Sequence, residues 1–197
     1  MDRIKLVNLA LTRLGTATVE RLDEPSEQAR VVNRVYDAVR QDLLRQYDWG
    51  FARRSVGLAE VQSDSGEYRF AYRVPADCLT VRRLRDENFI FLPRDNRFKI
   101  VGDERGRLIL TDVAAARLEY TADVQDEGLF DAEFSQAMSW KLAADVAMAL
   151  TGRPDLVQLM QSGFERYMLE AQWNDANEDN VEDPKLDRLA AARFEGV

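Results

Sequence analysis

The chain has 197 residues, of which 46% are hydrophobic and 31% are charged, and this is the composition of an ordinary globular protein. It contains no histidine and a single cysteine, Cys78, which excludes Ser–His and Cys–His catalytic pairs, zinc sites built from histidine or several cysteines, and an internal disulfide bond. Its net charge of −8 disfavours a protein that grips nucleic acid through phosphate groups, but is compatible with a conduit through which DNA slides.

Two amphipathic helices are predicted in the first part of the chain, over residues 2–14 and 26–47. Gly15 offers a stop to the first helix, and Ser26 is suited to cap the start of the second. Apolar residues form one stripe along the second helix, and Arg40 is predicted on the polar sides away from that stripe. The charged residues of the first helix predict that no signal peptide is present, and no stretch of the chain is apolar enough for a membrane span.

The middle of the chain, residues 52–124, changes to the two-residue period of strands. Trp49 and Phe51 lie where the helical pattern ends, and we expect them to form a core hinge between the two layers. Alternation is clear in residues 70–74 and 118–122, and the short spacing with tight turns predicts one antiparallel sheet. Further strands are predicted at Phe89–Leu92, Phe98–Val101 and Arg107–Thr111, with turns at Asp95-Asn96 and Asp103–Gly106.

The predicted helix over residues 131–150 is apolar nearly all round, because only Ser139, Lys141 and Asp145 are polar after residue 136. Such a helix must be covered on several sides. Two interpretations are open, the central helix of a single bundle or a helix with one face covered by another subunit. The residues concerned are Met138, Trp140, Leu142, Val146 and Leu150.

A helical hairpin is predicted next, because Gly152 can end one helix and Pro154 can begin another. The fourth helix is expected to run over residues 154–176 with its own apolar stripe. Six acids and no base then lie between Glu170 and Asp183, which predicts a solvated connector. Beyond Pro184, Leu186, Leu189 and Phe194 can share one face of a short helix that needs a partner to dock on.

Residues 69–107 hold ten bases and six acids, a local charge of about +4, and Arg82, Arg83 and Arg85 follow a predicted strand there. This segment is either a contact face for an acidic partner or DNA, or a solvated sheet face of mixed charge. The phenylalanines of the segment, Phe89, Phe91 and Phe98, are either stacking platforms for bases or core positions. Cys78 is predicted to be a buried thiol without a catalytic role.

Six segments, in this order, resemble the tail tubular protein A family, the head-to-tail adaptors of short-tailed bacteriophages. The segments are ALTRLG, EQARVVNRVYDAVRQDLLRQYDWGFARR, YRVPADCL, LEYTADV, LAADVAMALTG and LEAQWNDANED. The similarity covers roughly residues 6–179. Together with the periodicity, it implies an α+β fold in which a four-helix bundle-like domain (residues 1–51 and 125–178) carries an inserted antiparallel β-domain (residues 52–124), followed by an extended C-terminal tail (residues 179–197).

The resemblance implies a structural protein of the virion neck, made in the host cytoplasm, with no catalytic, cofactor-binding or metal-binding residues. Twelve copies would form a ring beneath the portal protein and above a tail nozzle or tubular protein, with a tail fibre or spike as a further candidate partner. DNA would pass through without specific binding, and no membrane is involved. The residues expected to bind the portal are Leu186, Leu189, Arg193 and Phe194. Two alternatives stay open, a virion-associated cell-wall glycosidase working through two carboxylates, and a small helical binding or regulatory module.

Overall fold

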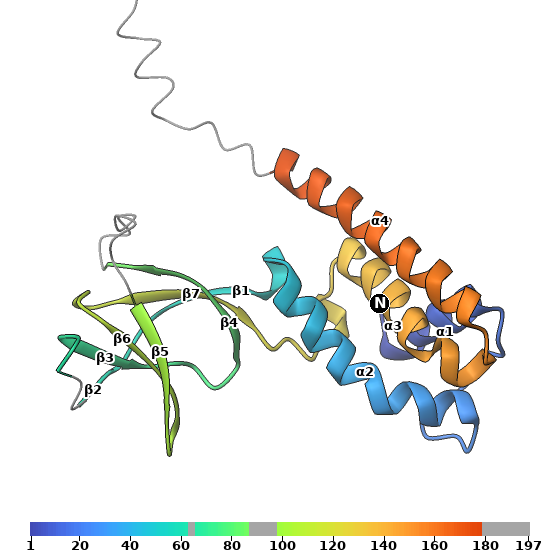
Figure 1. The fold of residues 1–197 in the computed structure, drawn as a ribbon, viewed down its shortest axis with the longest axis horizontal. Helices are drawn as coiled ribbons and strands as arrows, with labels where there is room; N and C mark the ends of the chain where they lie inside the picture. Colours follow the sequence, from blue (N-terminus) through green and yellow to red (C-terminus); the bar gives the residue numbers. More distant parts are fainter. Residues whose placement is uncertain (63–65, 87–97, 179–197) are drawn as a thin grey trace, which may run out of the picture.

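The computed structural model describes residues 1–62, 66–86 and 98–178, and within them the chain has an α+β fold (Figure 1). The helices lie at one end of the molecule and the strands at the other. The helices are α1 (Arg3–Leu14), α2 (Glu27–Gln46), α3 (Ala132–Thr151) and α4 (Pro154–Glu178), with short 3-10 turns η1 (Gly50–Ala52) and η2 (Glu127–Leu129). The strands are β1 (Arg53–Gly57), β2 (Glu60–Val61), β3 (Phe70–Arg73), β4 (Cys78–Arg85), β5 (Phe98–Asp103), β6 (Gly106–Thr111) and β7 (Arg117–Ala122).

The helices begin and end close to the predicted residues because their caps are local. The Ser26 side chain accepts a hydrogen bond from the Ala29 amide, as predicted, and Asp2 and Asp131 cap α1 and α3 in the same way. Gly15 ends α1 in the left-handed conformation, with φ of 68°. The fourth helix runs two residues further than predicted, to Glu178.

The strands form two antiparallel sheets, so the prediction of a single sheet is wrong. One sheet has the order β1-β7-β4 and the other the order β2-β3-β6-β5. The chain leaves β1 and then forms β2 in the other sheet after only two residues, Leu58 and Ala59. A switch between sheets over so short a connection leaves no turn signal in the sequence. The predicted turn at Asp103–Gly106 is confirmed, and it joins β5 to β6.

The arginines at positions 82, 83 and 85 lie within β4, so their placement after a strand is wrong. The register of β4 against β7 shifts between Cys78 and Thr80 and again between Val81 and Arg83. These irregularities interrupt the two-residue alternation that would have marked the strand. Several predictions fall outside the described residues. They are the strand Phe89–Leu92, the turn Asp95-Asn96, the side chains of Phe89 and Phe91, and the tail of residues 179–197.

The helices and part of the strands share a large hydrophobic core, and a smaller cluster of Tyr72, Val113 and Ala116 lies within the β part. Helix α3 packs against α1, α2 and α4, while β7 and β4 lie beside the C-terminal part of α2 (Figure 1). The core runs from Leu6 in α1 through Leu43 and Met138 to Leu118 in β7. The β part is therefore held to the helices by packing, in addition to the two places where the chain crosses between them.

Candidate functional site

The junction between the helices and the sheets gathers buried polar groups from distant parts of the chain. Arg40 of α2 is only 2% exposed, so its predicted place on a solvated side of the helix is wrong. Its guanidinium pairs with the Asp123 carboxylate and donates to the Val124 carbonyl at 2.7 Å. Gln41 donates to the other carboxylate oxygen of Asp123 at 3.1 Å. These bonds hold the connection from β7 to α3 against α2.

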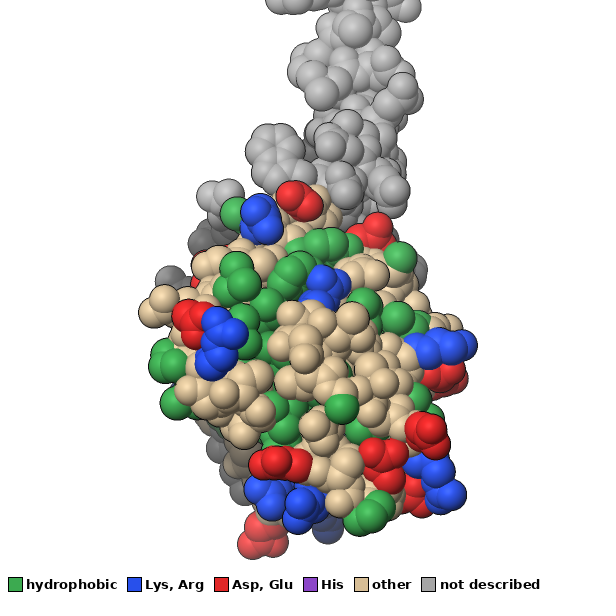
Figure 2. All heavy atoms as spheres, turned by 90° about the vertical axis from the view of Figure 1, so that its right-hand side faces the viewer, with side chains coloured by type: hydrophobic (Ala, Val, Ile, Leu, Met, Phe, Trp, Pro, Cys, Tyr) green, Lys and Arg blue, Asp and Glu red, His purple; other side chains and the backbone are tan. Residues whose placement is uncertain are grey.

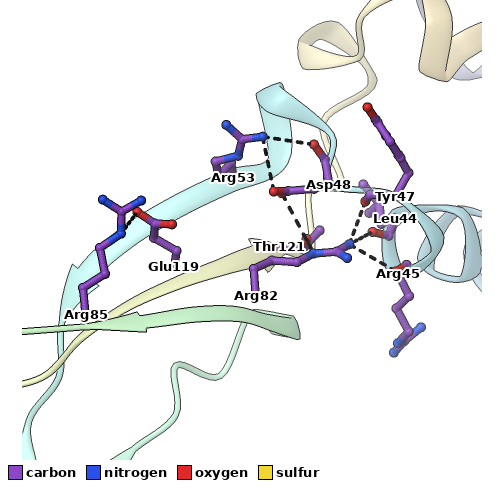
Figure 3. Close-up of polar contacts among 9 residues, drawn as sticks. All are labelled: Leu44, Arg45, Tyr47, Asp48, Arg53, Arg82, Arg85, Glu119 and Thr121. Carbon is purple, nitrogen blue, oxygen red and sulfur yellow. Dashed lines mark hydrogen bonds and ion pairs between the residues drawn. The ribbon is translucent and has the colours of Figure 1, made fainter. Parts of the chain in front are cut away.

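A second arginine holds the other crossing between the two parts (Figure 3). Arg82 of β4 reaches past the end of α2, where one nitrogen donates to the carbonyls of Leu44, Arg45 and Tyr47 at 3.2, 3.1 and 2.7 Å. Helix ends leave such carbonyls without intrahelical partners, and a cation satisfies both their hydrogen-bonding need and the negative end of the helix dipole. The Nε of the same guanidinium donates to the Thr121 hydroxyl at 2.8 Å. Arg82 is thus committed to the junction and is not a free cation on a contact face.

Other basic residues of the β part are also engaged within the chain. Arg85 pairs with Glu119 at 2.9 Å on the neighbouring strand (Figure 3), and Arg73 pairs with Asp103 at 2.6 Å. The Arg73 guanidinium holds the pKa of the Asp103 carboxyl at about 2. These pairs favour the interpretation of a sheet face with mixed charge for Arg73, Arg82 and Arg85.

An aromatic cluster lies where the end of α2 meets the start of α3. Trp49 and Phe51 both contact Phe134 of α3 edge-on, with ring centroids 5.1 and 5.0 Å apart. Trp49 is buried, and its indole N–H donates to the Leu43 carbonyl at 3.0 Å. Trp49 and Phe51 lie between α2 and β1, and their contacts with Phe134 pack the end of α2 against the start of α3.

Asp77 lies in the connection from β3 to β4 and holds that connection to the end of β7. Its carboxylate accepts a hydrogen bond from the Tyr120 hydroxyl at 3.1 Å, and its carbonyl accepts one from the Asp123 amide at 2.7 Å. Burial and the Asp77 carboxylate together raise the pKa of Tyr120 to about 12. Cys78 is buried, as predicted, and burial raises the pKa of its thiol. The thiol is therefore protonated at neutral pH and suited to packing.

The five residues singled out on α3 fall into two groups in the single chain. Met138, Leu142 and Val146 are fully buried. Trp140 and Leu150 are partly buried, and Trp140 packs against Gly163 of α4 and beneath the Arg13 guanidinium. The burial of the first three favours the interpretation of a central helix for those positions.

Large apolar side chains remain exposed on the outer side of the α3–α4 hairpin. Met148, Leu159 and Leu169 are 55, 59 and 60% exposed. Figure 2 views the end of the helical part at which α3 passes into α4, and hydrophobic side chains reach its surface in several places, mainly above the middle, among backbone and uncharged polar atoms. This surface is not evident from the sequence, because Met148 lies in a helix that is apolar nearly all round and the sequence does not show which side of that helix is left uncovered.

Within residues 1–62, 66–86 and 98–178, no group of three or more histidine, cysteine or acidic side chains could hold a metal ion. None of the described helices is long and apolar enough to cross a membrane. The expected portal-binding residues Leu186, Leu189, Arg193 and Phe194 lie outside the described residues. Comparison with known proteins finds no family model that matches the chain and no curated protein that matches it.

Proposed function

We propose that this chain is a subunit of a head-to-tail adaptor ring, which lies beneath the portal of a short-tailed bacteriophage and links it to the tail. The observation that carries the proposal is the ordered resemblance to the tail tubular protein A family over roughly residues 6–179. The proposal includes no catalytic residue, cofactor or metal.

The contacts between the resembling segments support this role. Arg40, from the long second segment, pairs with Asp123 of LEYTADV. The Asp123 amide in turn donates to the carbonyl of Asp77, from YRVPADCL. Segments far apart in sequence therefore meet at one junction and fix the β part to the helices. The buried ion pair and these hydrogen bonds fix the β part relative to the helices. Such fixation suits a structural subunit, because a ring requires each subunit to keep one orientation of its parts.

The exposed apolar side chains on α3 and α4 supply a surface for subunit contacts. A ring closes through heterologous contacts, in which each subunit presents two different surfaces to its neighbours. Met148 and Leu159, on the hairpin, belong to one candidate surface. Burying each of these side chains against a neighbour would contribute about 1.5–3 kcal/mol before the costs of ordering.

The charge of the chain fits a passage for DNA. A net charge of −8 repels phosphate groups, so DNA would slide past the ring without specific binding. The partners in this proposal are the portal protein above, a tail nozzle or tubular protein below, a tail fibre or spike, and further copies of the chain in a twelve-fold ring.

The proposed anchor to the portal is the C-terminal tail. Its apolar residues Leu186, Leu189 and Phe194, with Arg193, can dock in a groove on the portal as a short helix. Repetition around the ring would strengthen a weak individual contact through avidity.

The test compares the full chain with a truncation that ends at Glu182, each mixed with the portal protein of the same phage. Electron microscopy and sedimentation measure attachment, and thermal melting checks the folded body. We expect unchanged melting with attachment abolished or greatly weakened. The substitution Asp187→Asn, on the polar side of the same tail, serves as the matched control and should attach normally. Attachment of the truncated chain at the level of the full chain would remove the tail as the anchor, and failure of the full chain to attach would contradict the adaptor proposal itself.

A further inference from the structure

A groove of about 560 Å³ lies where three connections of the β part meet. It is formed by the end of β1 and the β1–β2 connection (residues 56–59), the end of β3 and the β3–β4 connection (residues 73–76), and the β5–β6 turn with the start of β6 (residues 105–107). These connections come from both sheets, so the groove exists only because the chain switches between sheets.

The charged side chains that line the groove are all arginines. Arg73, Arg105 and Arg107 line it, and none of its lining residues, all of which lie in the described part of the chain, is acidic. Arg73 is neutralised by Asp103, and Arg107 donates to the Cys78 carbonyl, so both are fixed in place. Within the described residues, the guanidinium of Arg105 has no ion pair or hydrogen bond, and this residue is exposed. The positive charge of the Arg105 guanidinium is therefore available to an anionic ligand in the groove.

The rest of the lining is apolar. Val56, Leu58 and Pro75 line the groove and are partly buried, and Val74 beside them is buried. The edge strand β1, which leads into the groove, pairs with β7 on one side only. A fitting ligand thus presents several negative charges around a small apolar side chain, on an extended backbone.

We propose that the groove binds the acidic segment at residues 178–183 of a second copy of this chain. In the sequence of this segment, the apolar Val181 is preceded by Glu178 and Asp179 and followed by Glu182 and Asp183. The groove supplies the opposite charge and an apolar lining, while the chain as a whole is strongly acidic.

The position of α4 favours a second copy over the same chain. In Figure 1, α4 ends at the top of the molecule, whereas the β3–β4 connection and the β5–β6 turn lie along the lower edge of the β part. The acidic segment of one chain therefore starts on the side away from its own groove. The inference rests on the proposed function in one respect, because both require copies of the chain to lie side by side.

The experiment titrates the full chain with a fluorescently labelled peptide of residues 177–184 at low ionic strength. We expect saturable binding that weakens as salt is raised, since exposed charges are screened. A peptide with the four acids replaced by their amides should not bind. The variant Arg105→Glu should bind the acidic peptide about tenfold more weakly or worse, a change worth about 1.4 kcal/mol.

The matched control is Arg83→Glu, which makes the same charge change at an exposed position of β4 outside the groove. It should change the affinity by less than about twofold, as expected for a distant surface charge. An equal loss in both variants would show general charge attraction and overturn the groove as the site. No binding of the peptide to the full chain would overturn the proposal outright. Either failure leaves the portal attachment assay interpretable, because that assay removes residues 183–197, which include only Asp183 of the acidic segment, and the full chain retains its native groove.

Discussion

The substitution Asp123→Ala tests whether the junction is held by its buried ion pair. The Asp123 carboxylate is the partner of Arg40, whose side chain is only 2% exposed, and it also accepts the Gln41 amide. Removing the carboxylate leaves the Arg40 charge buried and poorly paired. We therefore expect a clear loss of stability even though no hydrophobic contact is deleted.

The size of this loss follows from the geometry. Removing one partner of a buried ion pair typically costs about 3–5 kcal/mol. Two features reduce the cost here, because Asp123 is 16% exposed and Arg40 keeps its 2.7 Å hydrogen bond to the Val124 carbonyl. We expect a loss of about 2–3 kcal/mol in the free energy of unfolding. In a chain of this length, that corresponds to a fall of about 5–10 °C in Tm.

Urea unfolding and calorimetry measure the effect, with Asp37→Ala as the matched control. Asp37 also faces the Arg40 guanidinium, at 3.5 Å, but its side chain is 65% exposed. Its loss should cost no more than about 0.5 kcal/mol. Combining Asp123→Ala with Arg40→Met should cost less than the sum of the two single changes, since the double variant leaves no buried charge unpaired. Melting of Asp123→Ala within about 1 °C of the native chain would refute the reasoning.

Two further predictions concern α3 and the β5–β6 turn. Met138→Asp should lower the free energy of unfolding by about 4 kcal/mol or more, because Met138 is fully buried. The control Met148→Asp, at an exposed site on the same helix, should cost about 1 kcal/mol at most. Similar unfolding curves for the two variants would contradict the central position of α3. Arg73→Gln should return the pKa of the Asp103 carboxyl from about 2 towards 3.8, as followed by NMR titration. The folded-state pKa is depressed, so the stabilisation from this pair is present above about pH 3.8 and is lost as the pH falls towards 2; an unchanged titration in the variant would show that Arg73 is not the cause.

Much of the helical part could be predicted from the sequence, because its signals are local. The cap at Ser26 and the stop at Gly15 act within a few residues of the helix ends they determine. The apolar character of α3 likewise predicts a helix that is covered on several sides. The β part was harder to predict, because β4 has an interrupted alternation and β1 switches into the other sheet within two residues.

The candidate site depended on contacts that no local pattern encodes. Arg40 occupies a polar position of an amphipathic helix, and only the return of the chain at Asp123 converts that position into a buried one. Arg82 looked like one of a cluster of surface cations, but the end of α2 lies within reach of its guanidinium. The signal that could have indicated these roles is weak, since a single arginine at a helix or strand position is ordinarily solvated.

The sequence by itself determined the α+β class, the four helices to within two residues of their ends, the β5–β6 turn and the buried thiol of Cys78. Each of these follows from residues that are neighbours along the chain or share one face of one element. Only the tertiary structure decided that there are two sheets, that Arg40 is buried, that Met148 and Leu159 are exposed, and that three arginines line one groove. Periodicity defines which side chains share a face, but burial and charge pairing depend on what lies opposite that face, and this is set by contacts between residues far apart in the sequence.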